Sequence, residues 1–194
     1  MYEYIQGVLA ELTATTAVVE TGGVGYLLQI SMQTYEALAG RSEVRLYVHQ
    51  HLREDAVELY GFAAKAEREV FRLLTSVAGV GPSTARMVLS TYGVEELTRA
   101  IGAGDVDALK RVKGIGLKTA QRIVVDLSEK VGGVQADAGG IAQGRGSSAR
   151  QEALSALMTL GFAKGPTEKA LDELLRADAT MGVEALVKQA LKRM

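Results

Sequence analysis

Two short glycine motifs carry the residues best suited to chemistry in this sequence. Gly79-Val80-Gly81 and Gly114-Ile115-Gly116 each place an aliphatic residue between two glycines, with helical patterns on both sides. Glycine allows a tight turn between helices, and the aliphatic residue is expected to point inward and hold that turn. The free N–H groups that begin the next helix, together with the helix dipole, then form a site for one phosphate.

Candidates for phosphate binding extend from each turn into the helix that follows. Pro82 suits the first position of a helix, where the N–H group has no partner. Lys118 and Arg122 lie four residues apart on one helical face and supply positive charge. The full candidate set is Gly79, Val80, Gly81, Ser83, Arg86, Gly114, Ile115, Gly116, Lys118, Thr119 and Arg122.

The two turns belong to an internal repeat. Leu74–Ala85 aligns with Leu109–Ala120 at an offset of 35 residues. A single turn of this kind is usually only a compact helix corner, whereas a matched second copy favours a shared binding function. A Walker loop is excluded because Leu117, not glycine, stands directly before Lys118. A dinucleotide fingerprint would have to follow a strand, whereas these turns follow helical patterns.

A second group of candidates is acidic. Glu54 and Asp55 follow Arg53 between two strand patterns, which predicts a hairpin tip; a solvated turn is the simplest interpretation. A metal site built with His49 and His51, which share one strand face, is a weaker alternative. Two neighbouring carboxylates at a strand tip face apart, and so make a poor cluster for metal-dependent phosphodiester cleavage.

Composition limits the remaining classes of function. The 194 residues are 47% hydrophobic and 23% charged, which is typical of a globular protein. The absence of cysteine excludes disulfides, thiol catalysis and thiolate zinc sites. No signal peptide or spanning run is evident, so we expect a cytoplasmic protein without membrane association.

Charge is unevenly distributed along the chain, although the formal net charge is only −1. Residues 1–62 hold three Lys or Arg against eight Asp or Glu, whereas residues 63–131 hold eleven against eight. A polyanionic partner is therefore expected to bind the middle third of the chain.

The periodicity of the chain changes twice. Strand patterns cover Tyr2–Leu12, Thr15–Thr21, Val24–Ile30, Val44–His49 and Ala56–Phe62, with a hairpin at Gly22-Gly23 and a short helix near Gln33–Leu38. Five strands with one helix after the third is the order of an OB-fold barrel. Helical stripes follow, then a Gly-, Ala-, Gln- and Ser-rich stretch that predicts a flexible linker, and finally three short helical patterns.

In combination these motifs resemble the RuvA family of Holliday-junction-binding proteins. The tandem turns are similar to helix-hairpin-helix motifs. Four segments of this sequence match the motifs of that family: Gly22–Tyr26, Arg53–Ala56 with Leu59–Phe62, Gly79–Pro82, and Gly114–Ala120. The resemblance covers residues 1–130 closely, and the rest in length and character.

The resemblance implies a multidomain α+β fold. Its parts are an N-terminal OB-fold β-barrel at 1–62, a central tandem helix-hairpin-helix domain at 63–131, a flexible linker at 132–148, and a C-terminal three-helix, UBA-like module at 149–194. Ser83 departs from the family pattern, in which a lysine is expected.

The implied activity is that of a non-catalytic scaffold without cofactor or metal, which binds four-way junction DNA independently of sequence during recombination and repair. Members of the family form homotetramers with four-fold symmetry, and one or two tetramers bind a junction. Glu54 and Asp55 of four subunits would form a central acidic pin that repels phosphate and disfavours a continuous duplex.

The implied protein partners are a RuvB-type hexameric ATPase and a RuvC-type resolvase. The C-terminal module would bind the ATPase, with Val183, Leu186, Val187 and Leu191 as contact candidates. The same stripe also suits the core of that module, and the sequence does not apportion the two roles.

Two other classes of function remain open. A helix-hairpin-helix nuclease or glycosylase would need a catalytic Lys and Asp in a base pocket or a carboxylate–metal cluster, and the sequence offers neither pattern. A protein-only adaptor is the third alternative.

Overall fold

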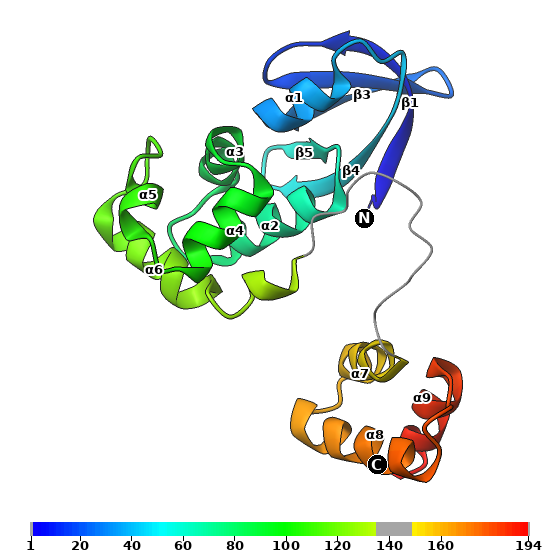
Figure 1. Cartoon of the computed structure of the whole chain (residues 1–194). Helices are drawn as coiled ribbons and strands as arrows, with labels where there is room; N and C mark the ends of the chain where they lie inside the picture. Colours follow the sequence, from blue (N-terminus) through cyan, green and yellow to red (C-terminus); the bar gives the residue numbers. More distant parts are fainter. Residues whose placement is uncertain (1, 135–148, 194) are drawn as a thin grey trace. The chain divides into compact units, whose positions relative to one another are not determined.

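The computed structural model describes residues 2–134 and 149–193 and has a mixed α+β architecture (Figure 1). Strands occupy the N-terminal third and helices the remainder, as the sequence patterns predict. The chain divides into two compact units, Met1–Gly139 and Gly140–Met194. From position 135 onward, the predicted linker lies outside the described residues.

Five strands close into a barrel. They are β1 (Tyr4–Leu12), β2 (Thr16–Thr21), β3 (Val24–Ile30), β4 (Glu43–Leu52) and β5 (Val57–Phe62), with helix α1 (Met32–Leu38) between β3 and β4. The order around the barrel is β1-β2-β3-β5-β4; β3 and β5 pair in parallel and the other neighbours are antiparallel. The predicted five-stranded barrel with one helix after the third strand is confirmed.

Local sequence explains how the barrel closes. Gly22 and Gly23 join β2 to β3 with φ angles of 58° and 80°, the positive values of a tight hairpin turn. Alternating apolar residues point inward, and closure pairs each of the five strands with a neighbour on both sides. The buried core consists of Ile5, Ala17, Val19, Leu28, Ile30, Leu38, Val44, Leu46 and Val48.

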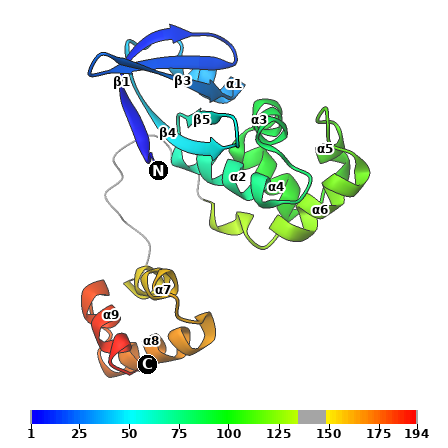
Figure 2. The ribbon, with the colours of Figure 1, turned by 180° about the vertical axis from the view of Figure 1, so that it is seen from behind.

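A helical domain completes the first unit. It contains α2 (Lys65–Ser76), α3 (Pro82–Thr91), α4 (Val94–Gly102), α5 (Val106–Lys110) and α6 (Leu117–Leu127). In both views α2 lies against β4 and β5, and α5 with α6 lies on the side away from the barrel (Figures 1 and 2). The Phe71 ring of α2 packs on Tyr60 and Phe62 of β5, with centroid distances of 5.0 and 4.9 Å.

The helical domain extends slightly beyond its predicted end at residue 131. A short 3-10 helix, η1 (Val131–Gly133), follows α6. Val131 is buried in the helical core, and Val134 packs against that core while partly exposed. Apolar packing therefore orders Val134, although the glycine-rich composition assigned residues from 132 onward to the linker.

The C-terminal unit is a three-helix module, as predicted. It consists of α7 (Ala149–Thr159), α8 (Lys164–Ala177) and α9 (Val183–Leu191), and Pro166 lies in the first turn of α8. Its small core contains Ala153, Leu157, Leu171, Leu174, Leu186 and Ala190. No helix among the described residues is both long and apolar enough to cross a bilayer.

Candidate nucleic-acid interface

The two glycine turns have the same backbone geometry. Gly79 and Gly114 have φ angles of 93° and 94°. The next glycines, Gly81 and Gly116, are helix N-caps with φ and ψ of −82° and 169°, and of −84° and 171°. Only the first glycine of each turn thus occupies the left-handed region that other residues avoid.

The hydrogen bonds of the two corners also correspond. Val80 N–H donates to Val77 O at 3.0 Å, and Ile115 N–H donates to Val112 O at 3.1 Å. The Val80 and Ile115 side chains are 4% and 5% exposed within the helical core, as predicted for residues that hold the turn. The sequence repeat is therefore a structural repeat of α2-corner-α3 and α5-corner-α6.

Each corner presents unpaired amide groups. In the described part of the chain, no hydrogen bond uses the N–H groups of Gly81, Ser83 and Thr84 in the first corner, nor of Gly116, Lys118 and Thr119 in the second. A Cβ placed on any of the four corner glycines would meet no atom within 4 Å. The corners are therefore open to a ligand, and each helix adds the positive end of its dipole.

Side chains near the corners differ in their exposure. Ser83 and Lys118 are exposed, and Thr119 is half-buried beside the second corner. Arg122 is also exposed, one turn along α6, with its Nε 3.7 Å from Asp126 Oδ2. Lys118 and Arg122 share the face that the sequence predicts, next to the second corner.

Arg86 does not extend freely from the first corner. Its Nη1 donates to Thr15 O at 3.0 Å and to Gln29 Oε1 at 2.8 Å, and both acceptors belong to the barrel region. The sequence places Arg86 one helical turn after Gly81 but contains no sign of the barrel surface beside it. The bonds that Arg86 Nη1 makes to the barrel region therefore compete with the predicted phosphate contact.

The acidic pair lies at a hairpin tip, as predicted. Arg53 N–H donates to Ala56 O at 2.8 Å and closes the connection between β4 and β5. Glu54 and Asp55 are exposed there, and neither makes a hydrogen bond or an ion pair within the described residues. Arg53 Nη2 lies 3.6 Å from Glu58 Oε2 at the base of the hairpin.

The described residues give no support to a metal site at the two histidines of β4, and His49 packs against an aromatic ring instead. The His49 ring lies 5.2 Å from the Phe71 ring, and its burial, with Arg72, His51 and Arg68 nearby, lowers the pKa of His49. Within residues 2–134 and 149–193, no three His, Asp or Glu side chains come close enough together to hold a metal ion.

The candidate contact residues of α9 divide between core and surface. Leu186 is fully buried in the core of the C-terminal module, and Val183 and Val187 pack against that core while partly exposed. Leu191, at 43%, is the most exposed apolar side chain of the four. A partner that docks on the intact module can reach Leu191 but not Leu186.

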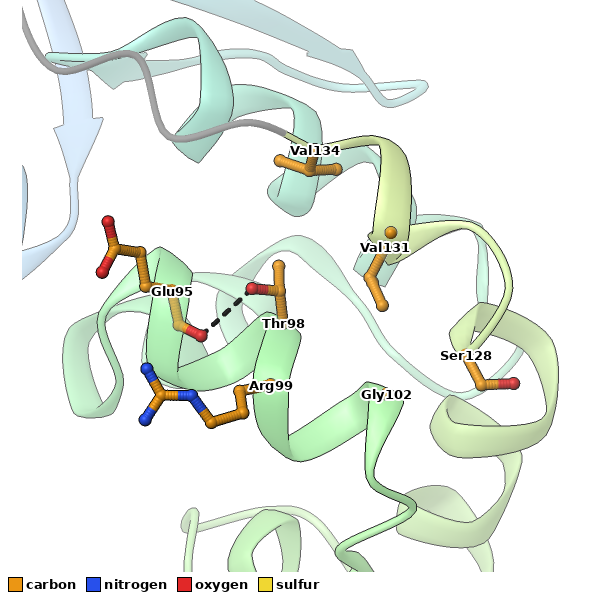
Figure 3. A pocket seen from close by; sticks show the side chains of 8 residues that line it. Glu95, Thr98, Arg99, Gly102, Ser128, Val131 and Val134 are labelled. Atoms are coloured by element: carbon orange, nitrogen blue, oxygen red, sulfur yellow. Dashed lines mark hydrogen bonds between the residues drawn. The ribbon is translucent and has the colours of Figure 1, made fainter.

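A hollow of about 450 Å³ lies between α4 and the segment after α6 (Figure 3). Thr98 Oγ1 donates to Glu95 O at 3.1 Å, while Glu95 and Arg99 project on the opposite side from Ser128 and Val131. The hollow is lined by Glu95, Thr98 and Arg99 of α4 and by Ser128, Val131 and Val134 of the segment that follows α6.

Comparison with known proteins covers the chain from end to end. Residues 1–61 match the RuvA N-terminal domain, 71–129 a SAM-like helix-hairpin-helix tandem, and 148–194 the RuvA C-terminal domain. Proteins named Holliday junction branch migration complex subunit RuvA are 46% identical in Bacteroides thetaiotaomicron and 47% in Bacteroides fragilis, with full coverage of both chains. The counterpart in Porphyromonas gingivalis is 44% identical over 99% of each chain.

The chain belongs to the RuvA family. This assignment confirms the resemblance seen in the sequence, together with the barrel, tandem helix-hairpin-helix and C-terminal helical parts of the fold. In this RuvA family member, the match to the helix-hairpin-helix tandem spans both glycine corners.

One pair of residues in this RuvA family member was not predicted from the sequence. Glu67 and Arg68 of α2 are only 3% and 6% exposed, and they bond to the barrel region. Glu67 precedes Val70, Phe71 and Leu74 at helical spacing, so its position on the apolar face was a detectable signal.

Proposed function

We propose that this chain binds four-way junction DNA through phosphate contacts at its two glycine corners, as a non-catalytic subunit of a branch-migration complex. The observation that carries the proposal is the pair of equivalent corners with open, unpaired amides. Relatives that this chain matches over their full length are named subunits of the Holliday junction branch migration complex. The function serves homologous recombination and DNA repair.

The proposed contacts are all to the DNA backbone. Amides of Gly81, Ser83 and Thr84 bind one phosphate, and those of Gly116, Lys118 and Thr119 bind another. Val80 and Ile115 contribute indirectly, because they hold the turns from inside. The Ser83 hydroxyl and the charges of Lys118 and Arg122 strengthen binding to these phosphates. Arg86 is left out of this set because its Nη1 is bonded to the barrel.

Specificity for a junction is proposed to come from the acidic hairpin. In a homotetramer with four-fold symmetry, Glu54 and Asp55 from each subunit gather at the centre of the DNA-binding face. Their charges repel phosphate, so a continuous duplex across the centre is disfavoured while separated strands pass around it. The exposure of both side chains, with no cation among the described residues bonded to either, supports this role.

The proposed protein partners follow from membership of the complex. The C-terminal module docks a RuvB-type hexameric ATPase, with Leu191 and the exposed sides of Val183 and Val187 as contacts. A RuvC-type resolvase is a further partner on the same junction, and one tetramer or two enclose the DNA. We place the complex in the cytoplasm, together with the DNA on which it acts.

Sequence-independent binding can be tested by titrating two four-way junctions of unrelated sequence in a mobility-shift assay. The expected result is equal affinity within about tenfold, with a steep fall of affinity as salt increases, because backbone contacts dominate. A larger difference between the two junctions would refute the proposal. A magnesium-dependent nicking assay on the same junctions distinguishes a scaffold from a nuclease, since the scaffold leaves both intact.

A further inference from the structure

Three charged side chains of the helical domain reach into the barrel region. Glu67 and Arg68 are consecutive residues in the first turn of α2, and Arg86 lies on α3, which begins at the first glycine corner. All three bond to groups that precede residue 64 in the chain. Together, Glu67, Arg68 and Arg86 are called the interdomain joint.

The Glu67 carboxyl group accepts bonds from Ser31 and Thr34 at the start of α1 and from the Ala63 backbone just before α2. Ser31 Oγ donates to Glu67 Oε1, and Thr34 Oγ1 donates to Glu67 Oε2 at 2.7 Å. Each hydroxyl already accepts a backbone proton, Ser31 from Thr34 N–H and Thr34 from Ala63 N–H. Because a hydroxyl has one proton, both are committed to Glu67, and the network fixes the direction in which α2 leaves the barrel.

Arg68, the next residue of α2, bonds to a different part of the barrel region. Its Nη1 donates to Glu3 O at 2.8 Å and its Nη2 lies 2.6 Å from Glu3 Oε1, next to β1. The guanidinium also lies 5.5 Å from the centre of the Tyr47 ring on β4. Two charged side chains on adjacent residues, which point in different directions from the helix axis, oppose rotation of α2 about that axis.

Arg86 ties the first corner itself to the barrel. The Nη1 group bridges Thr15 O, before β2, and Gln29 Oε1 on β3. Two bonds from α1 reinforce this tie: Met32 N–H donates to Ser90 Oγ at 3.1 Å, and Gln33 Nε2 donates to Tyr92 O at 2.6 Å. The helix that presents the first set of open amides is thus bonded along its length to the barrel that carries Glu54 and Asp55.

We propose that the interdomain joint holds the acidic hairpin at a fixed position relative to the glycine corners, and that Arg86 is a positioning residue of this joint. This inference rests on the proposed function. Repulsion by Glu54 and Asp55 can discriminate between junction and duplex only if the hairpin stays at a defined place relative to the phosphates that the corners hold. Apolar packing of Phe71 resists separation of the domains but is not directional, whereas hydrogen bonds to charged groups are.

The first experiment separates positioning from phosphate binding by comparing R86Q with R122Q in the full chain. Affinities for a four-way junction and for a linear duplex of the same arm sequence are measured across a salt series. R122Q is expected to lower the slope of log K against log salt by about 0.9 for each phosphate that it no longer binds, with an unchanged junction-to-duplex ratio. R86Q is expected to keep the slope and to reduce the ratio about fivefold, because loss of the bonds to Thr15 O and Gln29 Oε1 releases the hairpin from its fixed position.

The second experiment measures the joint without DNA. The chain contains no cysteine, so D55C and Q121C introduce a unique pair of spin-label sites, one on the hairpin and one on α6. Labelled chains are diluted with unlabelled protein so that only distances within a chain are observed. A narrow distance distribution is expected for the doubly labelled parent and for R122Q, and a broader one for R86Q and E67A.

The outcomes separate failure of the proposed function from failure of the positioning role. If the unsubstituted chain does not prefer junction DNA, the proposed function fails, whatever the distances show. If it prefers junctions but R86Q lowers the salt slope with an unchanged ratio and an unchanged distance distribution, Arg86 binds phosphate and the positioning role is overturned. Where E67A does not fold, E67Q retains the size of the side chain and replaces it in the same comparison.

Discussion

Gly79 and Gly114 stand 35 residues apart in the chain and have φ angles of 93° and 94°. The near-identity extends to the N-cap glycines and to the hydrogen bonds around them, so the two corners are equivalent units. Each supplies open amides at a helix N-terminus, and a pair of such units can hold two phosphates at a fixed separation. Backbone recognition of this kind binds DNA without reading its sequence.

Substitution of Gly79 or Gly114 by alanine should destabilise the first unit, because a Cβ in the left-handed region costs about 1–2 kcal/mol. Urea denaturation measures the decrease in stability. Gly102→Ala is the matched control, since that glycine lies in α4 at an ordinary φ with open space around it. Equal stability of all three variants would contradict the strain assigned to the corners.

Replacing both Lys118 and Arg122 by alanine should weaken binding to junction and duplex alike. The slope of log K against log salt should fall by about 0.9 for each phosphate that the variant no longer neutralises. Lys188→Ala with Lys192→Ala, in the C-terminal module, removes the same number of positive charges and serves as the control. A weakening confined to one DNA sequence would show that these side chains read bases instead.

Neutralising the hairpin with Glu54→Gln and Asp55→Asn should strengthen binding to linear duplex more than binding to a junction. We expect the preference for the junction to fall by roughly tenfold, since like-charge contacts cost up to several kcal/mol. Glu95→Gln with Glu96→Gln makes the same change in net charge on α4, away from the hairpin. If both double variants shift the preference equally, only the overall charge matters and the pin has no role.

Stability should depend on pH through Glu67. Burial raises the pKa of Glu67 above its ordinary value of 4.5, while the bonds from Ser31 and Thr34 partly offset that effect. A carboxyl with a raised pKa binds its proton more tightly in the folded chain than in the unfolded one. Its stabilising contribution is therefore complete below pH 4.5 and is lost as the pH rises through the raised pKa.

The difference in free energy of unfolding between the parent chain and E67Q isolates this effect, because glutamine does not titrate. We expect that difference to move against the parent as the pH increases from 4.5 upward, and then to level off. A difference that is flat with pH would mean that Glu67 has the same proton affinity folded and unfolded.

Two leucines of α9 should respond differently to truncation. Leu186→Ala removes a fully buried side chain, and the expected cost of about 2–5 kcal/mol should unfold the small C-terminal module. Leu191→Ala should leave the module folded and reduce affinity for the ATPase, because this side chain is 43% exposed. Thermal unfolding by circular dichroism and titration with the purified ATPase measure the two effects. Retained affinity in Leu191→Ala would exclude it as a docking contact.

Local patterns were sufficient for much of this protein. Alternation along β4, the Gly22-Gly23 turn and the repeated Gly-x-Gly corners each depend on a few neighbouring residues, so the barrel, the corners and the hairpin at Glu54 could be predicted from the sequence. The same holds for Val80 and Ile115, which point inward because a tight corner leaves an aliphatic side chain no other direction. These features also identified the family.

Only the tertiary structure decided what distant residues do to one another. In the sequence, Arg86 resembles a free cation one turn after a corner, yet it bonds to Thr15 and Gln29, which lie 71 and 57 residues away in the chain. Glu67 meets Ser31 and Thr34 only because α2 and α1 pack together, and Leu186 is core while Leu191 is surface because of how α9 rotates against α7 and α8. Periodicity assigns a side chain to a face, but the partner of that face is set by the packing of the whole chain.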